Sequence, residues 1–142
     1  MPYAFGTASR DHMKGVDPRM VKVLERAIQI SPVDFKVIEG VRTPQRQKKL
    51  YAQGRTEPGQ IVTWTLKSNH FVDPKTGFGR AVDLLPAPYD WKDPGQFDKM
   101  SRAMFEAARQ VGVKIRWGAD WDQDGKARER GESDSPHFEL AL

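Results

Sequence analysis

Apolar residues recur along three stretches of this chain at the three- and four-residue spacing that is typical of amphipathic helices. Each stretch begins just after an Asp-Pro or Thr-Pro pair. The first residue of such a pair can cap free backbone N–H groups, and proline fits the first helical turn because its missing N–H is not needed there. We therefore predict helices at residues 18–30, 44–53 and 94–111.

Shorter stretches between these helices alternate apolar and polar residues or are rich in β-branched and aromatic residues. They predict strands at 35–39, 61–66, 81–85, 113–117 and 137–140. Neither an internal repeat nor a low-complexity linker divides the chain, and 142 residues suit one domain with a substantial core. We expect a single domain over residues 1–142.

Composition narrows the classes of protein. The chain is 38% hydrophobic and 30% charged, and its longest apolar run falls far short of the roughly 20 residues that span a bilayer. The first ten residues lack the apolar region of a Sec signal peptide. A net charge of +4 and a pI near 9.4 suit an anionic partner but are equally common without one. Since no basic run is interleaved with aromatic residues, we expect neither nucleic-acid binding nor membrane insertion.

Candidate chemistry centres on two of the three histidines. The chain lacks cysteine, so any metal must be held by His, Asp, Glu or backbone oxygen. His70 and His137 lie beside polar turns, and Asp83 lies within an apolar strand, where an ionised carboxylate is costly unless it is paired or bound to metal. Asp134 precedes His137 by three residues. A histidine taken alone is more often structural, but two imidazoles and two carboxylates together indicate a catalytic zinc site.

The same residues carry a resemblance to a known family. The motif reads Ser68-x-His70, Gly79-x-Ala81-x-Asp83 and Asp134-x-x-His137. It resembles the D-alanyl-D-alanine carboxypeptidase/Hedgehog-type zinc peptidases, and is most similar to the L-alanyl-D-glutamate endopeptidases that tailed phages use as endolysins. Blocks at 40–56, 117–121 and 136–140 extend the resemblance over residues 17–141. It implies an α+β, Hedgehog/DD-peptidase-like domain with a small antiparallel sheet packed against about three helices.

The resemblance also implies a role for each site residue. His70, Asp83 and His137 would bind Zn²⁺, and Asp134 would act as the general base toward the metal-bound water. Arg42 matches an arginine that binds substrate or stabilises the developing oxyanion. If Asp134 were not the base, Glu132 and Glu139 would be the next carboxylates to test.

One spacing departs from the family pattern. The aspartate usually follows the histidine by seven residues, whereas here Asp83 follows His70 by 13, as though about six residues were inserted around 72–78. Asp73 is therefore a rival ligand. We prefer Asp83, because Asp73 lies in a Pro/Gly turn and lacks the Gly-x-Ala-x-Asp context.

A second ion site is a further alternative. Asp120, Asp122 and Asp124, followed by glycine, match the start of a calcium loop. The glutamate expected at the twelfth position is replaced by Gly131. The segment is therefore either a solvated acidic turn or a regulatory Ca²⁺ site of the kind that some phage relatives use.

Three functions remain open on the sequence. The first is a zinc endopeptidase that cuts the peptidoglycan stem peptide, acts as a monomer, and reaches the periplasm or cell wall from the host cytoplasm after holin-type release. The second is a D,D- or L,D-carboxypeptidase on the same scaffold. The third is a non-catalytic wall-binding module. The complete set of ligands and the presence of Asp134 favour a hydrolase.

Overall fold

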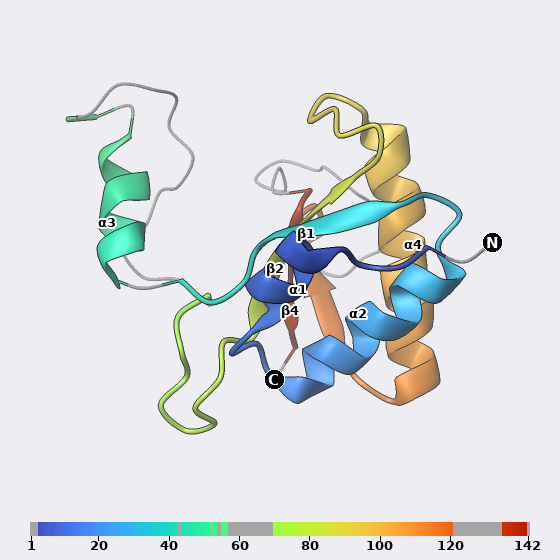
Figure 1. The fold of residues 1–142 in the computed structure, drawn as a ribbon, viewed down its shortest axis with the longest axis horizontal. Helices are drawn as coiled ribbons and strands as arrows, with labels where there is room; N and C mark the ends of the chain where they lie inside the picture. Colours follow the sequence, from blue (N-terminus) through green and yellow to red (C-terminus); the bar gives the residue numbers. More distant parts are fainter. Residues whose placement is uncertain (1–2, 43, 54, 57–69, 121–134, 142) are drawn as a thin grey trace.

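The computed structural model describes residues 3–42, 44–53, 55–56, 70–120 and 135–141. This part of the chain contains four helices and four strands (Figure 1). In chain order they are α1 (Thr7–Met13), α2 (Pro18–Ile30), β1 (Phe35–Glu39), α3 (Pro44–Ala52), β2 (Ala81–Pro86), α4 (Pro94–Val111), β3 (Ile115–Trp117) and β4 (His137–Leu140).

The predicted elements are confirmed where the structure describes them. All three predicted helices form within one residue of the expected bounds, and the strands at 35–39, 81–85 and 137–140 form likewise. The strand expected at 113–117 begins two residues later, at Ile115. The strand expected at 61–66 lies outside the described residues. Helix α1 is an additional element that the hydrophobic pattern does not predict.

The four strands form one antiparallel sheet in the order β1-β2-β4-β3, which confirms the expected α+β architecture. Helix α4 packs against β2 and β3, and α2 packs against α4. Figure 1 shows these two helices together on one side of the sheet, with α3 standing apart from the rest of the fold. The other side is therefore the one on which polar side chains can gather.

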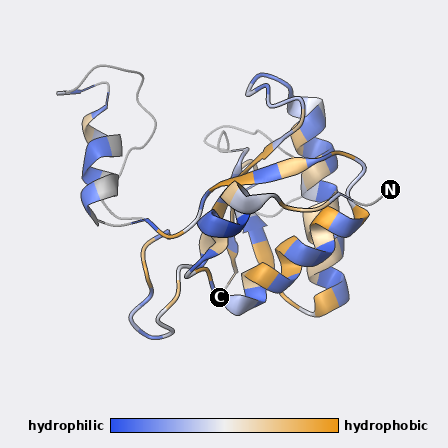
Figure 2. Ribbon diagram, viewed as in Figure 1, coloured by the Kyte–Doolittle hydropathy of each residue, from blue (hydrophilic) through white to orange (hydrophobic). Residues whose placement is uncertain are grey.

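The hydrophobic core lies between the sheet and these two helices. In Figure 2 hydrophobic and hydrophilic residues alternate along α2 and α4. Trp117 stacks on Phe138 with ring centroids 6.0 Å apart, which joins β3 to β4. Buried residues of α2, β2 and α4 in this core include Met20, Val23, Leu24, Ala27, Ile28, Val82, Leu84, Phe97, Met100, Met104 and Ala108.

Helix α1 packs against β1, which is an edge strand of the sheet. The Ser9 hydroxyl accepts a hydrogen bond from the backbone N–H of Val37 at 3.1 Å, which occupies one of the free groups on edge strand β1. Gly40, just after β1, approaches the end of α1 so closely that a Cβ atom there would lie 1.8 Å from the carbonyl oxygen of His12. Helix α1 therefore fixes the path by which the chain leaves β1.

Asp17 caps α2 and provides a test of the fold. Its side chain is 5% exposed, accepts a hydrogen bond from the backbone N–H of Arg19 at 2.9 Å, and pairs with that residue's guanidinium. We expect Asp17→Ala to lower the free energy of unfolding by about 1–2 kcal/mol, as measured by urea denaturation, because the N–H group loses its cap. Asp11→Ala should cost less than about 0.5 kcal/mol, since its ion pair with Lys14 is exposed.

The pH dependence follows from the same contacts. The side-chain hydrogen bond from Arg19 holds the pKa of Asp17 below its ordinary value in the folded protein. A depressed folded-state pKa contributes stability above the unfolded-state pKa, and this contribution disappears as pH falls through the folded-state value. The difference between wild type and Asp17→Ala should therefore shrink in acid. A difference that stays constant with pH would contradict the role of the ionised carboxylate.

Candidate metal centre

The register of the sheet brings the polar residues of three strands together. Asp83 on β2 lies opposite His137 on β4 and opposite Glu39 on β1. Side chains directly opposite each other on antiparallel strands project from the same face of the sheet. Val82 and Leu84, which flank Asp83, point to the other face and are fully buried in the core. The strand that buries these two residues thus presents Asp83 on the polar face.

A β-bulge places Glu39 on this polar face. Val37 pairs with Leu84, but the register shifts before Glu39, which pairs with Asp83. In a regular ladder Glu39 would lie opposite Val82 on the core face, because each one-residue shift turns a side chain to the other side. The extra residue therefore redirects a carboxylate from the core to the candidate site, as bulges near functional sites often do.

His70 reaches the site from the loop before β2. Its side chain is 2% exposed, its carbonyl oxygen accepts the backbone N–H of Arg42 at 2.8 Å, and its Nδ1 lies 2.8 Å from the carbonyl oxygen of Gly40. Because a carbonyl can only accept, Nδ1 is the protonated nitrogen. The other nitrogen, Nε2, lies 3.3 Å from Oδ1 of Asp83.

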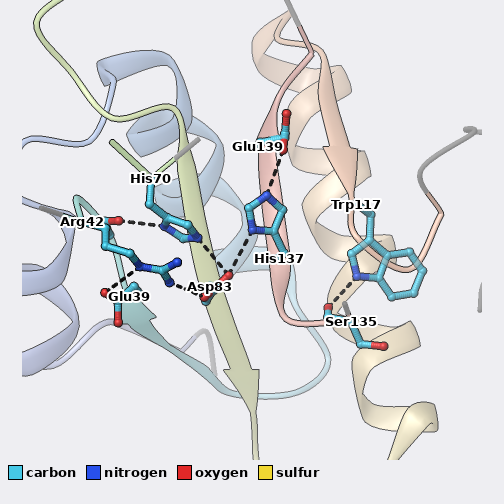
Figure 3. Close-up of polar contacts among 9 residues, drawn as sticks. Glu39, Arg42, His70, Asp83, Trp117, Ser135, His137 and Glu139 are labelled. Atoms are coloured by element: carbon cyan, nitrogen blue, oxygen red, sulfur yellow. Dashed lines mark hydrogen bonds and ion pairs between the residues drawn. The ribbon is translucent and has the colours of Figure 1, made fainter. Parts of the chain in front are cut away.

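His137 faces the same oxygen from the opposite direction (Figure 3). Its Nδ1 lies 3.3 Å from Oδ1 of Asp83, and its Nε2 lies 2.9 Å from Oε1 of Glu139. The rings of His70 and His137 meet edge to face with centroids 5.1 Å apart. One candidate ligand atom from each of His70, Asp83 and His137 lies within 4.8 Å of the other two. Among the residues that the structure describes, this is the one group of side chains found able to hold a metal ion.

The chemistry of this group fits a divalent cation. The outer nitrogens of both histidines face acceptors, so in the neutral imidazoles both inner nitrogens carry lone pairs directed at a carboxylate oxygen. Three electron-rich atoms this close repel one another unless a proton or a cation lies between them. Two histidines and one aspartate are also a typical donor set for zinc with an open coordination position.

Asp83 is ionised across the physiological range. Burial by itself raises the pKa of Asp83, but in the metal-free site hydrogen bonds from the rings of His137 and His70, when they carry protons on the nitrogens facing Asp83, outweigh this effect. The pKa of Asp83 therefore lies well below its ordinary value. The site offers a cation a carboxylate that is already deprotonated.

Arg42 completes the described part of the site. Its Nη2 lies 3.4 Å from Oδ2 of Asp83, and its Nε lies 3.3 Å from Oε1 of Glu39, with the side chain 10% exposed. The two oxygens of Asp83 are thus divided, one facing the imidazoles and the other facing the guanidinium (Figure 3). The structure brings Arg42 to the candidate centre, and its action on substrate stays a prediction.

The other predicted site residues either lie outside the described part of the chain or make contacts elsewhere. Asp134, Asp122 and Asp124 lie outside the described residues, so the general base and the calcium loop stay predictions. Asp120 is described, and its backbone N–H donates to the carbonyl of Trp117 at 3.0 Å. The carboxylate of the rival ligand Asp73 accepts the backbone N–H of Lys75 at 2.8 Å within its turn.

Sequence reasoning did not assign Glu39 to the site and considered Glu139 only as an alternative base. The position of Glu139 could have been predicted, because it follows His137 by two residues in a predicted strand and therefore shares its face. The position of Glu39 could not, because its orientation depends on a bulge with no distinct signal in the sequence.

Comparisons with known proteins identify the family of the chain. A family model described as phage L-alanyl-D-glutamate peptidase matches residues 1–141. The L-alanyl-D-glutamate peptidase of Escherichia phage T5 is 32% identical over 146 aligned positions, covering 99% of each chain. The peptidoglycan L-alanyl-D-glutamate endopeptidase CwlK of Bacillus subtilis is 28% identical over 127 positions, covering 82% of this chain and 66% of that protein.

A solved structure shares the fold. The Serratia marcescens L-Ala D-Glu endopeptidase ChiX superimposes with a TM-score of 0.73 at 28% identity, covering 97% of this chain and 90% of that one. Within the described residues, none of the helices is long and apolar enough to cross a membrane.

Proposed function

The chain belongs to the phage L-alanyl-D-glutamate peptidase family, and from this premise we propose that it is a zinc-dependent hydrolase of the peptidoglycan stem peptide. The bond cleaved is the one between L-alanine and D-glutamate. The observation that carries the proposal is the convergence of His70, Asp83 and His137 from three separate segments on one face of the sheet. The family match extends over nearly the whole chain and favours this reading over a carboxypeptidase or a non-catalytic module.

His70, Asp83 and His137 would hold the ion through Nε2, Oδ1 and Nδ1. A bound zinc ion supplies Lewis-acid chemistry, lowering the pKa of its water to about 7 and polarising the scissile carbonyl. Because two neutral imidazoles and one carboxylate cancel only one of its two charges, the site retains a net positive charge that favours a developing oxyanion.

The chain's own residues would handle the substrate and its protons. Asp134 would take a proton from the attacking water and return it to the leaving amine of D-glutamate. Arg42 places a fixed positive charge beside Asp83, which suits both the oxyanion and the carboxylate that D-glutamate brings to the cleaved bond. The division of Asp83 between imidazoles and guanidinium would hold these groups in one geometry before substrate arrives.

The place of action follows from the same proposal. The proposed substrate, peptidoglycan, lies outside the cytoplasm. The protein would therefore be made in the host cytoplasm and reach the periplasm or wall through a holin-type lesion late in phage infection. We propose that it works there as a monomer in lysis.

Digestion of purified sacculi tests the proposed function. Mass spectrometry of the released muropeptides should show new L-alanine carboxyl termini and new D-glutamate amino termini. Product formation should stop when a chelator removes the metal and resume when zinc is added back. Released D-alanine would instead identify a carboxypeptidase, and an absence of any product at saturating zinc would contradict the peptidase proposal.

A further inference from the structure

The two histidines of the centre are supported by different kinds of acceptor. The outer nitrogen of His70 faces the neutral backbone carbonyl of Gly40. The outer nitrogen of His137 faces the carboxylate of Glu139 at 2.9 Å. Figure 3 shows Glu139 and Asp83 at opposite ends of the His137 ring, so this imidazole is held between two carboxylates.

The sheet explains why Glu139 is in place. It follows His137 by two residues on β4 and therefore projects from the same face. Its partner on β2 is Ala81, which is small, and its partner on β3 is Arg116, which carries the opposite charge. Glu139 is only 3% exposed, and burying a carboxylate is costly unless it is hydrogen-bonded and paired. The hydrogen bond with His137 offsets part of this desolvation cost.

The contact decides which nitrogen of His137 can act as a ligand. An ionised carboxylate only accepts hydrogen bonds, so Nε2 must carry the proton and Nδ1 must carry the lone pair. That lone pair points at Asp83, where the cation would sit. A carboxylate partner also makes the imidazole a stronger donor to metal, which a neutral carbonyl does to a lesser degree.

We propose that Glu139 is a positioning residue, which fixes the tautomer and orientation of His137 and thereby sets the affinity of the centre for zinc. The inference rests on the proposed metal site but not on the identity of the bond that is cleaved. It also separates Glu139 from the role of general base, because its carboxylate engages the end of the imidazole that points away from Asp83.

Zinc affinity, measured by competition with a chromophoric chelator, tests this role. Glu139→Leu removes the acceptor and should raise the dissociation constant for zinc about 10- to 100-fold. Glu139→Gln keeps an acceptor oxygen but loses the charge, and should fall between the leucine variant and wild type. Glu106→Gln, which alters an exposed glutamate on α4, should leave the constant unchanged and serves as the matched control.

The measurement separates positioning from general stability. Each dissociation constant for zinc is measured at a temperature well below the thermal unfolding midpoint of the metal-free variant. A loss of global stability therefore does not change the measured constant. Zinc dissociation constants within twofold of wild type for both Glu139 variants would overturn the inference. If wild type binds zinc but cleaves no peptide, the proposed function is contradicted, while the effect of the Glu139 variants on zinc affinity still decides the inference. If wild type binds no zinc, the proposed function and the inference about Glu139 are both overturned.

Discussion

Asp83→Asn is expected to lower zinc affinity by about 10²- to 10³-fold and to reduce hydrolysis at limiting zinc in proportion. Oδ1 of Asp83 lies 3.3 Å from the facing nitrogens of both His70 and His137, so this oxygen is common to the whole site. A structural zinc site with four ligands binds with about 10–16 kcal/mol, so one ligand accounts for roughly 3 kcal/mol. An amide oxygen keeps the shape of the side chain but brings no charge to the cation.

Asp73→Asn is the matched control for this substitution, because it makes the same chemical change at the rival position. The carboxylate of Asp73 accepts a backbone N–H within its own turn, and an asparagine can accept the same bond. Zinc content after dialysis and the rate of muropeptide release should therefore be unchanged. Wild-type zinc content in Asp83→Asn, or its loss in Asp73→Asn, would show that the ligand has been misassigned.

The long spacing between His70 and Asp83 is accommodated by a closed turn. The backbone N–H of Asp73 donates to the carbonyl of Phe78 at 2.8 Å, and that of Gly79 donates to the carbonyl of Gly15 at 2.9 Å. The inserted residues thus leave and return at nearly the same point, and the chain then continues into β2. Surface loops tolerate such insertions at small entropic cost.

Much of the fold and the core of the site could be predicted from local signals. The helices were identified by caps and by periods long enough to recur several times, as in the 18 residues of α4. Asp83 was identified because an ionised acid in an apolar strand is energetically costly unless it is paired or bound to metal. These features depend on residues that are close in sequence, which is why one sequence suffices to find them.

The remaining features depend on contacts between distant segments. Helix α1 has only seven residues and no side-chain cap, so its formation relies on packing against β1. The bulge before Glu39 is a property of the pairing between two strands. The pairing of Arg42 with Asp83 spans 41 residues, and nothing in the local sequence around either residue indicates it.

Asp134→Asn is expected to separate metal binding from catalysis. The variant should bind zinc as wild type does, while its rate of muropeptide hydrolysis falls about 10²- to 10⁴-fold, the usual contribution of a general base. The chain that follows Asp134 is hydrogen-bonded to both neighbouring strands. The carbonyl of Ser135 accepts the indole N–H of Trp117 at 2.6 Å, and that of Pro136 accepts the backbone N–H of Leu84 at 2.9 Å. These bonds anchor the approach to His137 between β2 and β3.

The comparison that decides the role of Asp134 is with Glu132→Gln, which alters a second acid close by in sequence. If Asp134 is the base, Glu132→Gln should hydrolyse muropeptides at the wild-type rate and only Asp134→Asn should lose activity at saturating zinc. Loss of zinc in Asp134→Asn would make it a ligand or a structural residue instead. The reverse pattern of activity would transfer the role of base to Glu132, since Glu139 is already engaged with the far side of His137.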